Sequence, residues 1–527
     1  MEPSGRARLE RGELAVLAAL AAWSLVPLVS GLVHVWRFGG VLGGGDGVGV
    51  PDHYQYLAWI RAAGEHALVE NRFDVADEPA VFLQPMWVVS GALWRLGLPV
   101  QAAFLAWKPV AVGVLFGGYL AYVRRTVSGG SPALRLAALA LALLYFAPPG
   151  PLTEWLDAGS ELGRRASDQF TFELSPAMST WGYFHTSLAL GLMPVYVLAA
   201  ERVVAAGDRG GWGRPALAAG GAGLLVSWLH PWQGLVLLAV TAAVAAWGRG
   251  ARAYRRLAAP AAAAAAPLVY YWALARTDTA WRVGREAVDA PHHLGWLLLA
   301  LAPLAVPAAA ALWQRRGGPP LDLQERVLVA WPVATVAVYL LLDRSFFFHA
   351  VAGATLPLAV LAVRVRLPRR LGRPALAAGA AALLVLPGMV YEARKLRDAQ
   401  RSDNAAYYLR EGEARALEHL DSAPGGEAPV LARFRLAEAV PGHAGRAVYV
   451  GHPSWTPSFD RRYGEVEPLF DGRLSPADAR ALVRRSRARL AVSDCDRRRD
   501  LRPVLGSLVV RVRRFGCATV YELGPAS

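Results

Sequence analysis

The chain has 527 residues, of which 54% are hydrophobic and only 18% are charged. Soluble domains are about a quarter charged, so this composition excludes a soluble multidomain protein. A net charge of +15 is also found in nucleic-acid-binding proteins. Here, however, the arginines cluster between apolar blocks, where the positive-inside rule places them, and we expect no nucleic-acid partner.

The apolar residues gather in blocks of about 17 to 25 residues, the length of a membrane-spanning helix. We predict about eleven spans and a mainly α fold, a polytopic membrane helix bundle. The first block lacks a small-residue cleavage site and further blocks follow it, so we interpret it as a span and not as a signal peptide. The predicted spans are 14–35, 100–123, 133–147, 186–203, 215–229, 234–247, one ending near 275, 292–313, 327–342, one before 364, and 374–391.

Charge in the loops predicts the topology. Loops such as those after 123 and 313 are short and rich in arginine (Arg124, Arg125, Arg315 and Arg316), and we assign them to the cytoplasm. The N-terminus is then cytoplasmic and the region after the last span lies outside. The abundance of Ala, Arg and Gly indicates a high-GC bacterial genome, so we expect the bacterial inner membrane.

The first outer loop, 37–99, is long and polar. Residues 52–68 have apolar side chains at helical spacing and predict a short amphipathic helix. Residues 79–96 are apolar but interrupted by proline. We expect them to lie at the interface or to re-enter, because a full span there would place the later arginine clusters outside.

Asp52 is the strongest catalytic candidate in this loop. A carboxylate near the membrane surface can act as a general base on an acceptor hydroxyl. Its position near a predicted helix start suits an N-cap equally well. His53, Tyr54 and Tyr56 follow it as candidate substrate-binding residues, and for the tyrosines interfacial anchoring is the alternative. We expect most of the later acids, Glu70, Asp74, Asp77 and Glu78, to be solvated.

Scarce histidines gather at the predicted outer ends of other spans. They are His185, His230 and His349, with Arg344 nearby and Trp232 and Gln233 in the turn after His230. Such groups can bind a phosphate or diphosphate, and the planar fork of arginine suits this well. For each residue alone, a satisfied polar group at a helix end is the alternative. Lys108 lies inside a span, where a lysine faces a cavity or an acidic partner, or snorkels.

Residues 392–527 differ from the rest. Predicted strands at 429–433, 447–450, 489–493 and 519–523 alternate with helical patterns at 459–470 and 476–487, which indicates a small α/β domain. Ser475 precedes Pro476 as a good helix start. Cys495 and Cys517, the two cysteines of the chain, flank predicted strands on the outer side. An oxidising compartment permits a disulfide between them.

This pattern resembles the GT-C superfamily of integral membrane glycosyltransferases. The resemblance covers nearly the whole chain: an acid just after the first span, about eleven spans, and an extracytoplasmic C-terminal domain. The segments that resemble uncharacterised bacterial GT-C-like proteins are Pro51–Leu57, Phe82–Pro85, His230–Pro231, Val448–His452 and Trp455–Pro457.

The resemblance implies a transmembrane domain at 1–391 and an extracytoplasmic domain at 392–527. It implies an inverting hexosyltransferase or pentosyltransferase. The enzyme moves a sugar from a polyprenyl-phosphate donor to a glycan, lipid or protein acceptor, with Asp52 as the base. No Asp-x-Asp or Asp-Glu pair stands at Asp52, so no motif indicates the divalent metal that the resemblance allows. The cofactor is therefore unknown. A transporter or flippase, a polymerase of lipid-linked envelope glycan, and a non-catalytic scaffold are the alternatives.

Overall fold

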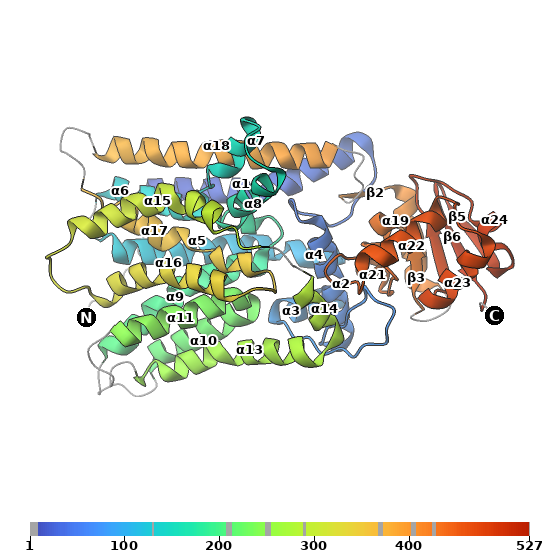
Figure 1. The fold of residues 1–527 in the computed structure, drawn as a ribbon, viewed down its shortest axis with the longest axis horizontal. Helices are drawn as coiled ribbons and strands as arrows, with labels where there is room; N and C mark the ends of the chain where they lie inside the picture. The colour runs from blue at the N-terminus through green and yellow to red at the C-terminus, as the bar shows by residue number, and fades with distance from the viewer. Residues whose placement is uncertain are drawn as a thin grey trace. The chain divides into compact units, whose positions relative to one another are not determined.

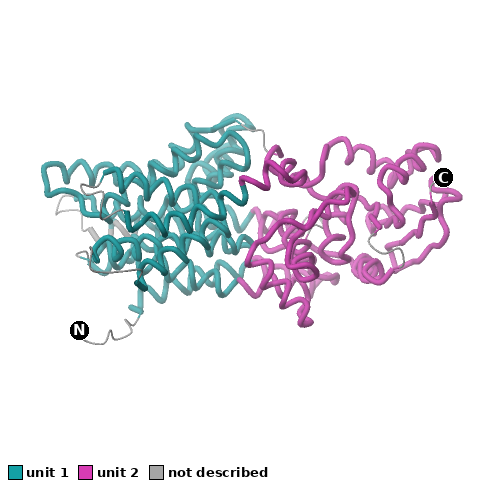
Figure 2. Tube along the Cα trace, turned by 90° about the horizontal axis from the view of Figure 1, so that it is seen from below, with its two compact units in different colours: residues 1–26, 108–271, 290–394 teal, residues 27–107, 272–289, 395–527 magenta. Residues whose placement is uncertain are grey.

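The computed structural model describes residues 9–128, 131–206, 213–247, 255–287, 291–366, 373–401, 407–423 and 428–525. They form two compact units (Figure 2). Unit 1 comprises 1–26, 108–271 and 290–394, and unit 2 comprises 27–107, 272–289 and 395–527. The first outer loop therefore belongs to the same unit as the C-terminal region. The sequence-based domain limits at 391 and 392 stay a prediction.

Unit 1 consists of helices (Figure 1). Those lying within it, apart from the first residue of α5, are α5 (Trp107–Thr126), α6 (Pro132–Leu144), α7 (Pro149–Trp155), α8 (Glu161–Glu173), α9 (Phe184–Ala205), α10 (Arg214–Leu229), α11 (Pro231–Trp247), α15 (Leu294–Gln314), α16 (Leu323–Leu341) and α17 (Thr355–Ala362), with the 3-10 turns η1 (Met178–Thr180) and η3 (Phe347–Val351). Besides α5, three helices contribute residues to both units: α1 (Arg11–Phe38), α13 (Ala258–Thr277) and α18 (Arg373–Arg401).

Each predicted span overlaps at least one helix of the structure. Within the described residues, six helices are long and apolar enough to cross a membrane, or up to seven if the bent pair α6 and α7 forms one span. These helices identify a multi-pass membrane protein. The number of about eleven spans stays a prediction.

Local sequence explains where the helices begin and how closely two of them pack. The Ser131 side chain accepts the Leu134 N–H at the start of α6, and Asp322 and Glu325 form a capping box at the start of α16. Gly118 of α5 faces Gly191 of α9. A Cβ on Gly118 would lie 1.9 Å from the Gly191 carbonyl oxygen, so this crossing requires glycine.

Unit 2 contains the first outer loop and an α/β domain. The loop carries β1 (Val41–Leu42), α2 (Val50–His66) and α3 (Pro85–Arg95). The helices α4 (Val100–Leu105) and α14 (Thr279–Glu286) also belong to this unit. Eleven residues make α3 about 17 Å long, too short to cross the bilayer alone. Strand β1 pairs antiparallel with β2 (Tyr408–Leu409) at the entry to the C-terminal region.

The C-terminal domain has a four-stranded sheet in the order β3-β4-β6-β5. Its strands are β3 (Val430–Ala432), β4 (Leu490–Ser493), β5 (Val509–Phe515) and β6 (Ala518–Leu523), and only the β3–β4 pair is parallel. The helices are α19 (Glu411–Ser422), α20 (Phe434–Ala437), α21 (Val440–Ala444), α22 (Phe459–Phe470), α23 (Pro476–Ser486) and α24 (Arg502–Leu505). Leu469, Leu482 and Ala491 lie in the buried core of this domain.

Several expectations for this domain are confirmed and two are wrong. Ser475 caps α23 by accepting the Asp478 N–H, and Cys495 and Cys517 form a disulfide. The predicted strand 447–450 is wrong, because only Val448 makes an isolated bridge there, to Val430. The edge strand β5 was not predicted, because its exposed arginines hide the apolar alternation of a strand.

The disulfide predicts a measurable loss of stability on its removal. Cys495 and Cys517 are 22 residues apart, and opening a loop of this size costs about 3 kcal/mol in the chain-entropy model. We expect Cys495→Ser, Cys517→Ser and the double variant each to lower the melting temperature of the detergent-solubilised chain. The three decreases should be equal, because each variant removes the same bond. A melting temperature unchanged by reductant and by all three variants would contradict the assignment.

Candidate functional site

Helix α2 places the Asp52 carboxylate at its first turn. The helix begins after Gly49, with Pro51 in its first turn, and no side chain caps it. The N-cap role for Asp52 is therefore wrong. A carboxylate in the first turn is still favoured by the partial positive charge of the helix N-terminus. The Asp52 side chain is 41% exposed, whereas its helix is buried on nearly all sides from His53 to Gly64.

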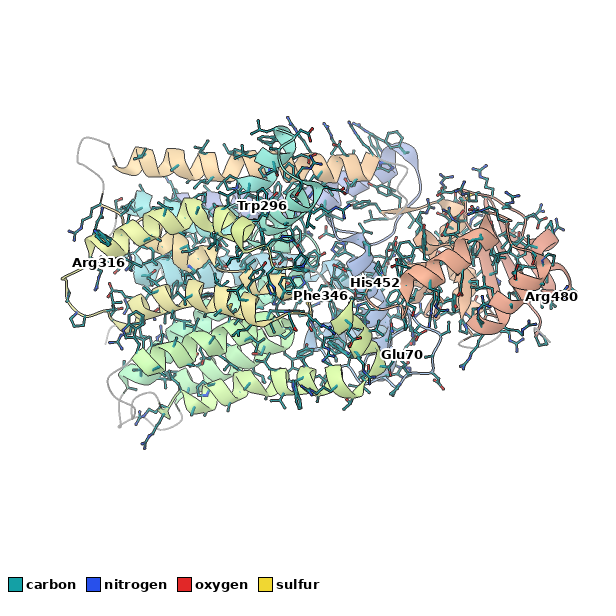
Figure 3. The ribbon with its side chains drawn as sticks, in the orientation of Figure 1. Glu70, Trp296, Arg316, Phe346, His452 and Arg480 are labelled. Carbon is teal, nitrogen blue, oxygen red and sulfur yellow. A yellow bond between two sulfur atoms is a disulfide. The ribbon has the colours of Figure 1, made fainter. Side chains whose placement is uncertain are left out.

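His452 stands beside Asp52. Its Nε2 atom lies 3.5 Å from Asp52 Oδ1, and its side chain is only 3% exposed. The His452 Nδ1 atom accepts the backbone N–H of Ser454 at 3.1 Å. In the neutral ring the hydrogen is then on Nε2, which forms no hydrogen bond with a described residue, so its 3.5 Å approach to Asp52 is an electrostatic contact. Figure 3 labels His452 within the C-terminal region.

Glu438 is a second carboxyl group close to Asp52. It follows α20, is 3% exposed, and its Oε1 atom has no hydrogen-bond partner among the described residues. Burial, and secondly the charge of Asp52, raise the pKa of Glu438 to about 8. At neutral pH this group is mostly protonated.

Hydrogen bonds between the first outer loop and the C-terminal region hold this arrangement. Asn71 Nδ2 donates to the Trp455 carbonyl at 2.9 Å, and the Thr456 hydroxyl donates to the Phe73 carbonyl at 2.9 Å. The Val448 N–H donates to the carbonyl of Arg72 at 3.0 Å. These bonds lie on both sides of His452 in the sequence, so they set its position relative to the loop.

Two loop acids expected to be solvated take part in the same contact. Asp74 is buried and pairs with Arg462 at 2.5 Å, and Glu70 pairs with Arg72 at 2.6 Å. The guanidinium of Arg72 also donates to the Gly445 carbonyl at 2.8 Å. The expectation of solvation is wrong for Asp74, because its arginine partner lies about 390 residues later in the chain, beyond the reach of local sequence patterns.

The residues after Asp52 lie in the core of unit 2. His53, Tyr54 and Tyr56 are at most 7% exposed, and the His53 Nδ1 atom accepts the backbone N–H of Asp46 at 3.0 Å. Tyr56 stacks on Trp87 with ring centroids 5.0 Å apart. The substrate-binding role of these three residues stays a prediction.

In unit 1 the three histidines meet. The ring centroids of His185 and His230 are 6.2 Å apart, and those of His230 and His349 are 5.7 Å apart. Glu173, at the end of α8, lies 2.9 Å from His349 Nδ1 through its Oε1 atom. His230 is buried, and its Nδ1 atom has no hydrogen-bond partner among the described residues. We call these four residues the histidine cluster.

The turn after His230 supports the cluster. The Trp232 ring lies 4.9 Å from the His349 ring, and its indole Nε1 donates to the Ser345 carbonyl at 2.6 Å. Gln233 Nε2 donates to the His349 carbonyl at 3.0 Å. Arg344 is exposed, and no hydrogen bond or ion pair among the described residues joins it to the cluster. The roles of these residues in binding stay predictions.

Lys108 neither snorkels nor faces an open cavity. It is 4% exposed, and its Nζ atom donates to the carbonyls of Ser24 at 2.6 Å and Thr180 at 3.1 Å. Its ammonium group also lies over the Phe184 ring, 5.3 Å from the centroid. The lysine thus joins α1 to the η1 turn inside unit 1.

Within the described ranges, no three His, Cys, Asp or Glu side chains are placed to hold a metal ion together. Sequence reasoning missed Glu438 and the pairing of His452 with Asp52. The only indication of the latter was that His452 lies in the segment Val448–His452, which carries the family resemblance.

Comparison with solved structures identifies the fold. The chain is similar to ArnT from Cupriavidus metallidurans bound to undecaprenyl phosphate, with 14% identity, a TM-score of 0.54, and coverage of 98% of this chain and 100% of that chain. It is also similar to the apo oligosaccharyltransferase of Archaeoglobus fulgidus, with 14% identity, a TM-score of 0.52, and coverage of 97% and 74%. No protein-family model and no curated protein matches the sequence. Both structures belong to the GT-C superfamily, so the GT-C fold that the resemblance implies is confirmed.

Burial of Glu438 predicts a pH-dependent stability. A carboxyl whose pKa is raised on folding binds its proton more tightly in the folded state. Its contribution is therefore complete below the ordinary value of 4.5 and is lost as the pH rises toward about 8. We expect Glu438→Gln to remove a slope of up to about 1.4 kcal/mol per pH unit in this window. Thermal unfolding between about pH 5 and pH 8 measures it.

The exposed Glu418, on α19 of the same unit, supplies the control variant Glu418→Gln. It should follow the wild-type pH profile. If Glu438→Gln also followed that profile, Glu438 would not hold a proton in the folded protein.

Proposed function

We propose that this chain is an inverting membrane glycosyltransferase that moves a hexosyl or pentosyl group from a polyprenyl-phosphate donor to an acceptor outside the cytoplasm. The observation that carries the proposal is the Asp52 carboxylate, part exposed at the start of α2 and faced by His452. The GT-C fold supports it, because this fold is found in membrane glycosyltransferases that include ArnT bound to undecaprenyl phosphate.

Asp52 acts as the general base in this proposal. It accepts the proton of the acceptor hydroxyl as that oxygen forms a bond to the anomeric carbon of the sugar. The bond from the anomeric carbon to the phosphate oxygen breaks, and the electron pair leaves with the polyprenyl phosphate. One displacement inverts the configuration at the anomeric carbon.

His452 and Glu438 adjust the base. His452 lies 3.5 Å from the Asp52 carboxylate through its Nε2 atom, and in this proposal the imidazole orients the base through this electrostatic contact. Glu438 is mostly protonated at neutral pH, so it does not oppose the negative charge that Asp52 needs as a base. A neutral neighbour leaves that charge on the more exposed of the two carboxyl groups.

The histidine cluster binds the phosphate of the donor in this proposal. Imidazole N–H groups donate hydrogen bonds to phosphate oxygens, and Arg344 adds a positive charge at the membrane surface. Trp232 and Gln233 contribute by fixing the segment that carries His349. The acceptor is a glycan, a lipid or a protein, and membrane lipid surrounds the spans.

The arginine-rich loops support a location in the bacterial inner membrane, with the N-terminus in the cytoplasm and the C-terminal domain outside. Reaction on the outer side then requires a lipid-linked donor, because nucleotide sugars are made in the cytoplasm. Cysteine labelling from outside tests this topology, and labelling at Arg124 or Arg315 replaced by cysteine would overturn it.

Asp52→Asn tests the base. The amide keeps the shape of the side chain but cannot take the proton, so we expect turnover to fall about 10²- to 10⁴-fold with a nearly unchanged KM for donor. The assay is sugar transfer from polyprenyl-phosphate sugars by the purified chain in detergent. Asp77→Asn makes the same chemical change at an exposed position of the same loop and should leave turnover unchanged. Equal turnover of Asp52→Asn and wild type would refute the catalytic role.

The histidine cluster yields a separate kinetic prediction. His230→Gln and His349→Gln each remove a group proposed to contact the donor phosphate, so we expect KM for donor to rise about tenfold. His66→Gln, at an exposed end of α2, is the matched control. If donor KM is unchanged while the fold is intact, the cluster does not bind the donor.

A further inference from the structure

A cleft in unit 2 combines aromatic rings with carboxyl groups. Its aromatic lining residues are Trp59 of α2, Phe82 of the first outer loop, Trp281 of α14 and Trp455 of the C-terminal region. Glu70, Glu78 and Asp278 also line it. Figure 3 labels Glu70. We call this the aromatic-acidic cleft.

The four rings form a continuous cluster. Trp59 lies 5.1 Å from Phe82 and 5.3 Å from Trp455, measured between ring centroids. Trp281 lies 4.7 Å from Phe82 and 5.5 Å from Trp455. Trp59, Phe82 and Trp455 are at most 9% exposed, whereas Trp281 is half-buried, so the accessible ring surface is mainly that of Trp281.

The carboxyl groups of the cleft are not balanced by cations in its wall. Glu70 is neutralised by Arg72, and Asp278 accepts the Trp281 N–H as the cap of α14. The Glu78 Oε2 atom is buried and has no hydrogen-bond partner among the described residues. No arginine or lysine is among the residues that line the cleft.

The electrostatics of the cleft are therefore unfavourable without a ligand. Burial, and then the charges of Asp278 and Asp74, raise the pKa of Glu78 to about 7. A cation placed at Glu78 would relieve this repulsion. The cleft stands out because the whole chain carries a net charge of +15.

We propose that the aromatic-acidic cleft binds a primary alkylammonium group. The cation would lie against the ring surface of Trp281, which attracts it through the ring quadrupole, and would pair with Glu78 and Asp278. A neutral sugar could stack on the same rings and donate hydroxyl hydrogen bonds to the carboxylates, but it would not neutralise their charge. The amine of a lipid headgroup, a lysine side chain and an amino sugar share this chemistry. The inference goes beyond sugar transfer, and binding can be measured without it.

Saturation-transfer NMR on the full chain in detergent tests the proposal. Propylammonium is titrated at about pH 8, where Glu78 is ionised, against the uncharged 1-propanol. We expect saturable binding of propylammonium and none of propanol. Equal binding of the two would overturn the proposal.

Three variants locate the binding. Glu78→Gln and Asp278→Asn each remove a charge, and the asparagine can still cap α14. Trp281→Leu removes the ring. We expect each to weaken propylammonium binding about two- to fivefold. Asp77→Asn, next to Glu78 but exposed, is the control and should bind as wild type does. Unchanged affinity in the three cleft variants, with melting temperatures near that of wild type, would place the amine elsewhere and overturn the proposal.

Competition against propylammonium distinguishes the sources of the amine. The competitors are lysine amide, glucosamine against glucose, and nanodiscs of phosphatidylethanolamine against phosphatidylglycerol. Displacement by any one of the amines alone supports the proposal and names the source. Glucose as effective as glucosamine, or no displacement by any amine, would overturn it. If Asp52→Asn loses sugar transfer but still binds propylammonium, both proposals are supported. Because the two measurements are independent, either proposal can be refuted without the other.

Discussion

The contact between the first outer loop and the segment from 445 to 456 is the constraint on which the candidate site depends. Backbone groups of Arg72 and Phe73 and the side chain of Asn71 bond across it, and the Arg72 guanidinium donates to the Gly445 carbonyl. Removing one partner of such a bond leaves a buried polar group unsatisfied, which is unfavourable. The contact therefore holds His452 in place, and with it the group that faces Asp52.

Exposure distinguishes the two neighbouring carboxyl groups. Asp52 is part exposed and Glu438 is buried, so desolvation acts mainly on Glu438 and raises its pKa to about 8. Environments that separate the pKa values of two carboxyl groups are a feature of acid–base sites, and in the proposed mechanism Asp52 takes the role of the base.

The histidine cluster in unit 1 arises from a different source. His185, His230 and His349 each lie near an end of an apolar helix or in the turn that follows it. Apolar helices of similar length end at similar levels in a bundle, so polar residues at these ends come together. The predicted span ends and loop charges led us to expect that these histidines gather. Their ring contacts and the pairing of His349 with Glu173 are seen only in the packed helices.

The sequence by itself determined the elements. Apolar blocks predicted where the helices of the bundle lie, because hydropathy depends on local composition. Ser475 and Pro476 predicted the start of α23, and the presence of two cysteines on the outer side predicted the disulfide. Strand β5 and the wrongly predicted strand at 447–450 show the limit of this approach. An edge strand and a loop can have similar residues, and only the hydrogen bonds to a neighbouring strand distinguish them.

Only the tertiary structure decided which residues meet. Asp52 and His452 are 400 positions apart and Asp74 and Arg462 are 388 apart, and no local pattern encodes such pairs. Burial also belongs to the folded chain: Glu438 and Tyr54 become desolvated only when α2, α20 and α21 pack within unit 2. A charge pattern can place a loop on one side of a membrane, but the environment that sets a pKa forms only on folding.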